Sequence, residues 1–466
     1  MSQVRERIYP RLPVFAQNLA CGVQGSSQRK LRYGGVFPDM LAWLEESQWW
    51  TACKVEEYRE DNLQKLIRHA YDTVPYYRSV FDSLTLTPDD IRTSADLPKL
   101  PMLTKEDVFR HRDALVSKAC DTKDLVFCHT SGTTGKSLQF YQEPSAIQFR
   151  WAVWWRHKRR FGVEFDAPYA TFTGLTAVPL TQCKPPFWRE SKPMHQTIFT
   201  MHHVVPANVP AIVQRLNEGG FNYYTGYPSI LNLLASLIRE QGLAITAPPK
   251  AVFTGAETLY ADQRENMAEV FQCVVTDQYG FSEGCGNASR CPQDLIHEDF
   301  EFGILECDQP EITKNGDRRG SIVATGFSSF AMPFIRYQVG DVGTWQSAIC
   351  TCGRHSSVLS QIEGRVEDYV VTPEGRHILR FDYIFKDTHH IREAQVVQGR
   401  PDCIRIVVVR RPGYSAEDET LIRDEIKRRI SERLLVSFDY VDEIPREANG
   451  KFRAVKSLLR QPRAIP

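Results

Sequence analysis

Residues 128–142 read CHTSGTTGKSLQFYQ and contain the residue types of a loop that binds phosphate groups: glycines that free backbone N–H groups, hydroxyl groups, and a lysine. The loop consists of Thr130, Ser131, Gly132, Thr133, Thr134, Gly135 and Lys136. It is not a Walker A motif, because Thr130 stands where that motif has its first glycine. Leu138 and Phe140 alternate with polar neighbours, which predicts a strand, whereas a Walker A loop leads into a helix. By composition alone, the segment also fits an ordinary surface turn.

Four further segments carry residues that could act with this loop. They read DQYGFSEG at 277–284, RYQVGD at 336–341, GRVED at 364–368 and PREANGK at 445–451. The first follows a predicted strand, and parallel sheets bind ligands at the carboxyl ends of their strands. Each segment alone also has a plain interpretation, since glycine next to tyrosine or aspartate marks turns and caps. The segments indicate a shared function with the phosphate loop only when they are taken together and in this order.

The composition limits the classes of partner. The chain has 466 residues, with 57 Lys plus Arg and 57 Asp plus Glu, so its net charge is zero. Without a positive excess, a nucleic-acid or anionic-membrane partner is not expected. The charged N-terminus MSQVRERIYPRL is no secretory signal, and no apolar run reaches the length of a membrane span. Twelve cysteines in such a chain indicate a reducing compartment, so we expect a cytoplasmic protein without disulfides.

An α/β fold must position these segments. Between residues 207 and 280, helical patterns alternate with short strand patterns, which predicts βαβ units and a mostly parallel sheet. A long helix is expected to stop before Pro75. Its apolar face consists of Leu63, Leu66, Ile67 and Ala70. Residues 300–350 are strand-rich.

A smaller α+β unit follows. It contains a strand CIRIVVVRR, an amphipathic helix and a strand VSFDYVDEI. The inward positions of that helix and its end are Leu421, Ile422, Ile426, Ile430 and Leu434. We therefore expect a large α/β domain at 1–364 and a small C-terminal domain at 365–466.

Two cysteine-containing segments indicate a metal site. The candidate ligands are Cys291 and His297 at C-x5-H, with Cys350 and Cys352 at C-x-C. Three thiolates and one imidazole form the closed tetrahedral set that is typical of structural zinc. Cys285 is a reserve ligand and His355 a weaker one. The alternative is four unrelated residues, since cysteine is among the most buried residue types.

The five ordered motifs TSGTTGK, YGFSE, RYQVGD, GRVED and PREANGK resemble the signature motifs of the adenylate-forming (AMP-binding) ligase superfamily, over nearly the whole chain. HAYDTVPYYR, LPKLPMLTKEDV and DQYGFSE look like the phenylacetate–CoA ligase branch. LPVFAQNLACGVQG, RYGGVF and YYTGYPS look closer still to CapK-type proteins of capsular polysaccharide biosynthesis. The resemblance implies an enzyme that uses ATP to convert a carboxylic acid into an acyl-adenylate, and then transfers the acyl group to a thiol or an amine.

The resemblance also implies residue roles in the phosphate chemistry. The 130–136 loop would hold the β- and γ-phosphates, Glu283 would bind Mg²⁺, and Arg365 would lie near the ribose and phosphates. Lys451 would swing in with a mobile C-terminal domain and bridge the carboxylate and the α-phosphate. Two residues depart from the family pattern. Glu367 stands where the family has its hinge aspartate, and is expected to take the hinge role. Ser137 stands where the family usually has a proline.

The remaining implied roles concern the nucleotide and the acyl group. Tyr279 would stack on adenine, Asp277 would meet its amino edge, and Asp341 would accept from both ribose hydroxyls. Further residues of the nucleotide site are Gly255, Ala256, Glu257, Gly280 and Ser282. The acyl pocket is expected to use Tyr224, Gly226, Tyr227 and Pro228, floored by Gly255 and Ala256. The alternative for YYTGYPS is plain strand-to-helix packing, with Ser229 capping the helix.

Two acceptors stay open at this point: coenzyme A, giving a thioester, or an amine of a sugar or amino acid, giving an amide. The cofactors implied are ATP, Mg²⁺ and structural Zn²⁺. The zinc ion would fix the Glu283 loop relative to the Asp341 loop. A homodimer is also left open. A different class is a non-catalytic, zinc-stabilised binding protein, against which intact Glu283, Asp341 and Lys451 argue.

Overall fold

The computed structural model describes residues 8–129, 138–174, 176–363, 369–378, 381–385, 388, 390–445 and 453–459. Three predicted segments lie outside the described residues: the loop 130–137, GRVED at 364–368, and residues 446–452 of the PREANGK region. Thr130 to Lys136, Arg365, Glu367 and Lys451 therefore keep the roles given above as predictions. The described residues that flank these segments define the candidate site.

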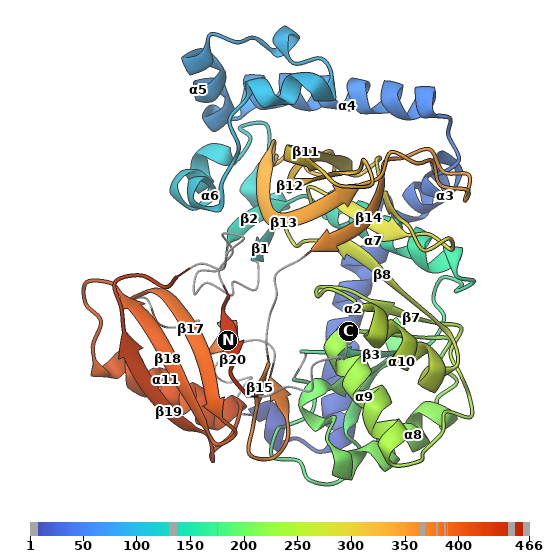
Figure 1. Ribbon diagram of the computed structural model, residues 1–466, viewed down its shortest axis with the longest axis vertical. Coiled ribbons are helices and arrows are strands. Elements are labelled where there is room, and N and C mark those ends of the chain that lie inside the picture. The colour runs from blue at the N-terminus through green and yellow to red at the C-terminus, as the bar shows by residue number, and fades with distance from the viewer. Residues whose placement is uncertain are drawn as a thin grey trace.

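A twelve-stranded sheet forms the centre of the large domain (Figure 1). Its strands, in chain order, are β3 (Tyr169–Thr173), β4 (Trp188–Ser191), β5 (Gln196–Thr200), β6 (Tyr223–Gly226), β7 (Ala251–Thr254), β8 (Val274–Gly280), β9 (Asn287–Arg290), β10 (Ile296–Glu298), β11 (Gly303–Ile312), β12 (Arg318–Gly326), β13 (Tyr337–Trp345) and β14 (Val358–Glu363). The order across the sheet is β11-β12-β13-β14-β10-β9-β8-β7-β6-β3-β5-β4. Strands β5, β3, β6, β7 and β8 run parallel, whereas β9 to β14 and β4 pair antiparallel. The predicted α/β class is confirmed.

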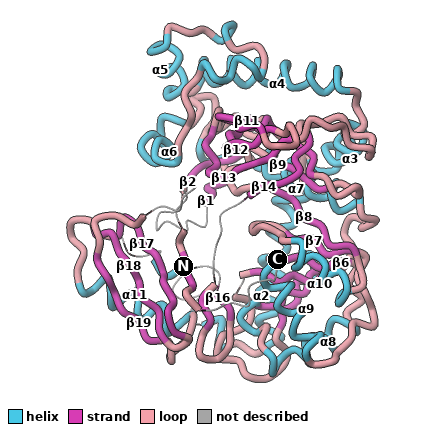
Figure 2. Tube along the Cα trace, in the orientation of Figure 1, coloured by secondary structure: helices cyan, strands magenta, loops and turns pink. Residues whose placement is uncertain are grey.

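Parallel neighbours need crossover connections, and helices supply them. The crossovers are α8 (Val209–Glu218), α9 (Pro228–Glu240) and α10 (Ala261–Phe271). Figure 2 shows these helices alongside the parallel strands, and a hydrophobic cluster that includes Ile230, Leu234 and Val252 fills the interface. The alternating helices and strands predicted between 207 and 280 are confirmed.

Two paired strands precede and follow the predicted phosphate loop in the sequence. Strand β1 (Val126–His129) pairs antiparallel with β2 (Gln139–Gln142), and His129 lies opposite Gln139. The side chains of Leu138 and Phe140 are buried. The segment after the loop is a strand, as the alternation predicted, so the loop is not a Walker A motif.

The remaining helices of the large domain are α2 (Val14–Tyr33), α3 (Phe37–Ser47), α4 (Ala52–Thr73), α5 (Pro75–Leu84), α6 (Lys105–His111) and α7 (Pro144–Arg160). Of these, α3 and α7 pack against the parallel strands β3, β6 and β7, and α4 and α5 pack against the antiparallel part of the sheet. The predicted face of α4 is confirmed: Leu63, Leu66, Ile67 and Ala70 are fully buried. Pro75 is the first residue of α5, because proline cannot continue the preceding helix but fits a first turn. None of the helices in the described ranges combines the length and apolar character needed to cross a lipid bilayer.

A four-stranded sheet with the order β19-β18-β17-β20 lies apart from the large sheet (Figure 1). The C-terminal elements are β15 (Val370–Val371), β16 (His377–Ile378), β17 (Ile391–Arg400), β18 (Cys403–Arg410), α11 (Ala416–Arg429), β19 (Leu435–Tyr440) and β20 (Val455–Ser457). Ile422, Ile426, Ile430 and Leu434 are buried in a core of their own, as predicted. Leu421 is 46% exposed, so its inward assignment was wrong: one residue is about 100° around a helix from the next. The boundary at 365 stays a prediction.

Lys158, on α7, is a buried lysine surrounded by aromatic rings. It is 8% exposed, and its Nζ lies 5.1 Å from the ring centroid of Trp155. The rings of Trp151, Tyr223 and Phe253 lie within 6.0 Å. Burial, aided by the charge of Arg32, lowers the pKa of Lys158 to about 7.

We expect Lys158→Met to raise the Tm of the protein most at about pH 6 and least at about pH 10. The pKa of Lys158 falls from 10.5 to about 7 on folding, so the native state binds this proton more weakly than the unfolded chain. The wild-type protein therefore gains stability as the pH rises between these two values, and the advantage of methionine shrinks. Calorimetry across this pH range measures the difference, with Lys65→Met on the exposed side of α4 as control. A pH-independent Tm difference for Lys158→Met would contradict this account.

Candidate functional site

The carboxyl ends of β7 and β8 lie side by side, and two predicted nucleotide segments follow them. Thr254 pairs with Asp277 at these ends. A Cβ on Gly255 would lie 3.7 Å from the backbone oxygen of Gln278, so the two segments are adjacent. Ala256 is exposed and has a φ of 69°, a left-handed conformation that is strained for a residue with a side chain. Strained, exposed backbone at strand ends is typical of ligand sites.

Glu257 points toward the start of α9. Its Oε2 accepts from the backbone N–H of Ser229 at 3.2 Å and from the Ser229 hydroxyl at 2.7 Å. A carboxylate is favourable there because the first N–H groups of a helix lack backbone partners. The packing alternative expected Ser229 to cap this helix, but the N-cap is Tyr227, which makes no side-chain hydrogen bond there. Glu257 therefore holds the turn between β6 and α9, and its contact with a nucleotide stays a prediction.

Two tyrosines hold the two carboxylates that the motifs assign to the nucleotide. The Tyr279 hydroxyl donates to Asp341 Oδ2 at 2.9 Å, and the Tyr337 hydroxyl donates to Glu283 Oε1 at 2.8 Å. Burial and the neighbouring Asp341 carboxylate hold the pKa of Tyr279 well above its usual range, so its hydroxyl stays a donor. The structure thus brings Tyr279 and Asp341 together across β8 and β13. Tyr337 was not singled out from the sequence.

The strand after the phosphate loop is tied to the Glu283 loop. The Gln142 side chain donates to the backbone oxygen of Glu283 at 2.9 Å, and Arg150 donates to that of Ser282 at 2.9 Å. Gly280 approaches Asn287 so closely that a Cβ would lie 2.7 Å from its Oδ1. Sequence reasoning missed Gln142 and Arg150. The signal for Gln142 was a polar residue at an inward position of an alternating strand, since it is 2% exposed.

Asp277 faces arginine side chains. Arg290 Nε donates to Asp277 Oδ1 at 2.5 Å, and Arg264 lies 3.7 Å from the same oxygen. Arg290 also donates to the backbone oxygen of Asp294 at 2.8 Å, and Arg264 pairs with the Asp294 carboxylate. Because both arginines approach Oδ1, a contact with adenine would fall to Oδ2, and that role stays a prediction.

The acyl-pocket residues divide into two groups. Tyr224 is fully buried and packs against Phe271, with its ring centroid 5.5 Å away, so its side chain belongs to the core between sheet and helices. A Cβ on Gly226 would lie 2.3 Å from the Phe172 oxygen, so Gly226 serves the close approach of β3 and β6. For these two residues the observed contacts fit the plain packing alternative, since strand alternation turns Tyr224 toward the helices. Their assignment to the acyl pocket stays a prediction.

Tyr227 lies instead at the carboxyl ends of the strands. A Cβ on Gly174 would lie 3.7 Å from the Tyr227 hydroxyl and 3.9 Å from the Met201 Sδ atom. Gly174 follows β3 and Met201 follows β5, so three strand ends converge here. Sequence reasoning missed Gly174 and Met201, because only the order of the strands in the sheet brings them close to Tyr227.

The four predicted metal ligands come together. One ligand atom from each of Cys291, His297, Cys350 and Cys352 lies within 4.8 Å of the others. Cys291 follows β9, His297 lies in β10, and both other cysteines lie in the loop between β13 and β14. The strands β9, β10 and β14 are neighbours in the sheet, which brings these distant segments together.

The surroundings of this cluster fit a metal. Cys352 Sγ lies 3.3 Å from His297 Nε2, and Ser356 Oγ contacts the opposite ring nitrogen at 3.5 Å, which orients the imidazole. Burial and the positive charge of Arg354 lower the pKa of His297 to about 4, so the ring is neutral, as a ligand must be. The reserve ligands are not part of the cluster: Cys285 lies in the main hydrophobic core, and His355 is exposed.

The fold is that of an adenylate-forming ligase. The solved structure of 2-hydroxyisobutyryl-CoA ligase in complex with 2-HIB-AMP and CoA superposes with a TM-score of 0.56 at 19% identity, over 88% of this chain and 91% of that chain. In sequence, the phenylacetate–coenzyme A ligase of Thermus thermophilus is 24% identical over 68% of this chain and 72% of its own. The predicted resemblance to this class is confirmed.

Within this class, the chain is similar to CapK. Protein CapK of Staphylococcus aureus is 24% identical over 96% of this chain and 98% of its own length. Residues 370–458 match the family model of the CapK C-terminal domain. The predicted CapK-type resemblance is therefore confirmed as well.

Proposed function

We propose that this protein is an ATP-dependent, AMP-forming ligase that converts a carboxylic acid into an acyl-adenylate and transfers the acyl group to coenzyme A. One observation carries the proposal. Two tyrosine–carboxylate pairs, the half-buried Tyr279 with Asp341 and the buried Tyr337 with Glu283, link β8 and the loop after it to β13, and Gln142 of β2 contacts the same loop. The similarity to phenylacetate–coenzyme A ligases supports coenzyme A as the acceptor.

In the first half-reaction, the substrate carboxylate attacks the α-phosphate of ATP and pyrophosphate leaves. Negative charge builds up on the phosphates, so donors and cations must already be in place. The loop 130–136 holds the β- and γ-phosphates, with Lys136 as its cation. Lys451 bridges the attacking carboxylate and the α-phosphate, and Arg365 lies beside the ribose and phosphates.

Glu283 fits the role of a magnesium ligand. It is a buried carboxylate whose Oε1 accepts from Tyr337, which leaves Oε2 to face a cation, and Mg²⁺ prefers such oxygens together with phosphate. Bound Mg²⁺ would neutralise phosphate charge. Asp341 accepts from the ribose hydroxyls, and its bond from Tyr279 fixes the carboxylate while the tyrosine ring stacks on adenine.

We also propose a structural zinc ion at Cys291, His297, Cys350 and Cys352. Four protein ligands leave no open position, so the role is positional. The turn that carries Cys291 also includes Asp294, whose backbone oxygen accepts from Arg290. Arg290 in turn pairs with Asp277 at the end of β8. The zinc would therefore fix both the nucleotide end of β8 and the loop that follows Asp341.

A second candidate function is amide formation with an amine of a sugar or an amino acid in surface-polysaccharide assembly. The observation that favours it is the extent of the CapK similarity, which spans 96% of this chain, against 68% for the phenylacetate–coenzyme A ligase of Thermus thermophilus. Both candidates share the first half-reaction and differ only in the acceptor.

The experiment that tests the proposal is carboxylate-dependent ATP–pyrophosphate exchange with aryl, fatty and amino acids. Acids that support exchange are then tested with coenzyme A and with hydroxylamine, an amine that traps acyl-adenylates. Thioester formation would establish coenzyme A as the acceptor, and hydroxamate without thioester would favour an amine. Absence of exchange with every acid would instead favour the non-catalytic binding protein, and release of ADP would indicate a kinase.

We expect Tyr337→Phe to raise the Mg²⁺ concentration needed for half-maximal adenylation by about tenfold, since one hydrogen bond to a charged group contributes about 1.5–3 kcal/mol. The substitution removes the donor that orients Glu283 but keeps the buried ring. A magnesium titration of the exchange rate measures the effect. Tyr58→Phe removes a hydroxyl that donates to the backbone oxygen of Glu301, outside the nucleotide motifs, and should leave the magnesium dependence unchanged. Equal titration curves for Tyr337→Phe and the wild type would contradict the role of Tyr337.

A further inference from the structure

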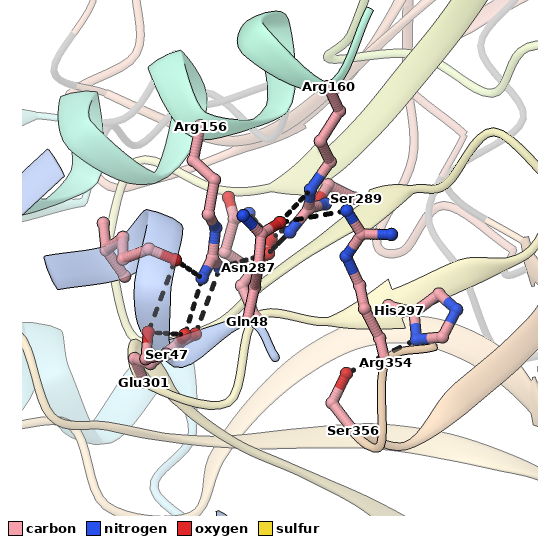
Figure 3. A network of polar contacts seen from close by, with 12 residues as sticks. Ser47, Gln48, Arg156, Arg160, Asn287, Ser289, His297, Glu301, Arg354 and Ser356 are labelled. Carbon is pink, nitrogen blue, oxygen red and sulfur yellow. Dashed lines mark hydrogen bonds and ion pairs between the residues drawn. The ribbon is translucent and has the colours of Figure 1, made fainter. Parts of the chain in front are cut away.

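A pocket of about 580 Å³ opens between α3, α7 and the two loops that carry the candidate zinc ligands. Four arginines line it: Arg156, Arg159, Arg160 and Arg354. The carboxylate of the lining is Glu45, and Gln48 and Trp49 complete the wall toward α3. Figure 3 shows two arginines of α7: Arg156 points toward Glu301, and Arg160 points toward Gln48 and Ser289, on the side where Arg354 lies. The residues assigned above to nucleotide and acyl binding are not part of this lining.

Part of this positive charge is neutralised within the protein. Arg156 donates to Asp299 at 2.7 Å and to Glu301 at 2.5 Å, a buried ion network behind the wall. Arg159, which is 35% exposed, donates to both oxygens of Glu45 at 2.7 and 2.8 Å. Arg156 therefore has a structural role that needs no ligand. The pair between Arg159 and Glu45 is partly exposed, where ion pairs contribute little, so Arg159 can turn toward an anion in the pocket.

The other two arginines are compensated less fully: Arg160 also donates to the Ser289 hydroxyl at 2.7 Å, whereas the ion pairs of the described residues include none of Arg354. Arg160 donates at 3.1 Å and Arg354 at 2.9 Å to one and the same atom, Gln48 Oε1 (Figure 3). Arg160 lies 3.6 Å from Asp299, which already accepts from Arg156. Two guanidinium groups thus share one neutral amide oxygen. Burial and the neighbouring Arg156 lower the pKa of Arg160 to about 9, which reflects the cost of this buried charge.

Unpaired donors add to the imbalance. The Nε atoms of Arg156, Arg159 and Arg354 are buried, and the described residues offer them no acceptor. Buried N–H groups without an acceptor are costly, so polar partners are expected. A zinc ion bound by three thiolates and an imidazole would add one negative charge near Arg354 but no acceptor beside Arg160.

We propose that this pocket binds a small phosphate-bearing molecule, held by Arg159, Arg160 and Arg354. A guanidinium group presents paired donors that match phosphate oxygens, and a phosphate offers more oxygens and more negative charge to several arginines than a single carboxylate does. Trp49 is 54% exposed beside Arg354 and can pack against a ring of the ligand. The volume lies within the range of small-molecule sites, about 300–1,000 Å³. The phosphate could come from a nucleotide or pyrophosphate, or from a phosphorylated sugar.

The test is titration calorimetry on the full-length, zinc-containing protein with inorganic phosphate, pyrophosphate, AMP, glucose 1-phosphate and citrate. We expect at least one phosphate compound to bind with a Kd below about 1 mM. Arg159→Gln and Trp49→Ala should weaken this binding by about tenfold, and added salt should weaken it too. Binding of AMP is repeated with Asp341→Asn, and binding of pyrophosphate with Lys136→Ala, since both variants leave this pocket intact. A response tied to glucose 1-phosphate identifies a sugar phosphate as the source.

Arg68→Gln on α4 is the matched control, because Arg68 is 63% exposed, has a surface salt bridge and lies outside the pocket lining. Its binding should equal that of the wild type. Arg159 and Trp49 are partly exposed, so both variants should fold, and their zinc content and Tm are checked first. The proposal is overturned if no phosphate compound binds below about 1 mM, if citrate binds equally well, or if Arg159→Gln and Trp49→Ala both retain wild-type affinity.

Discussion

The Lys451→Ala protein should form acyl-adenylate at least about 100-fold more slowly than the wild type, since a single preorganised charge at a developing anion contributes this much or more. In the wild-type protein, the ammonium group of Lys451 is needed between the attacking carboxylate and the α-phosphate, where negative charge builds up. The second half-reaction does not pass through this charge. A preformed acyl-adenylate should therefore still transfer its acyl group to the acceptor at close to the wild-type rate.

ATP–pyrophosphate exchange measures the first half-reaction, and consumption of synthetic acyl-adenylate measures the second. Lys456→Ala is the matched control, because Lys456 is an exposed lysine of β20, five positions further along the chain. It should retain both half-reactions. Comparable losses of both in Lys451→Ala would rule out the assignment of Lys451 as the adenylation lysine.

Cys350→Ser and Cys352→Ser should each abolish zinc binding and lower the Tm by on the order of 10 °C. Loss of one ligand opens the tetrahedral set, and the loop between β13 and β14 is then no longer linked to the turn after β9. A loss of a few kcal/mol corresponds to such a shift, because about 1 kcal/mol moves the Tm of a large domain by about 2–4 °C. The Km for ATP should also rise, since Arg290 holds Asp277 through the same turn.

Elemental analysis and calorimetry measure these effects, and a strong chelator should reproduce them in the wild-type protein. Cys307→Ser is the control for a partly buried cysteine outside the cluster, and it should keep both zinc and Tm. Cys285→Ser separates the two assignments of that residue: it should keep zinc even where loss of its core packing lowers the Tm. Unchanged zinc content and Tm in both Cys350→Ser and Cys352→Ser would contradict a structural zinc site.

The sequence predicted elements whose signals are local. The spacing of Leu63, Leu66, Ile67 and Ala70 defines one helical face, and Pro75 ends the helix by removing a backbone donor. The alternation of Leu138 and Phe140 predicted β2 from an equally local signal, because side-chain direction along a strand has a period of two. Leu421 shows the limit of such patterns, since an apolar residue at the edge of a helical face can lie on either side.

Residue chemistry was also readable without the fold. The ordered motifs indicated the ligase class, and the spacing of Cys291 with His297 and of Cys350 with Cys352 indicated one metal set. These inferences depend on residue types that carry chemistry and on short spacings. The same residue types did not tell whether Tyr224 faces a substrate or the core, because both environments accept a tyrosine.

By itself, then, the sequence determined the helices and strands, the class of fold and the residues able to do chemistry. The tertiary structure alone decided which side chains meet: Tyr337 with Glu283, Arg290 with Asp277, and Arg160 with Arg354 on one amide oxygen. The physical reason is that such contacts depend on strand order and crossovers. The order β13-β14-β10-β9-β8 joins segments far apart in the chain, and no periodicity along the sequence records which strands become neighbours.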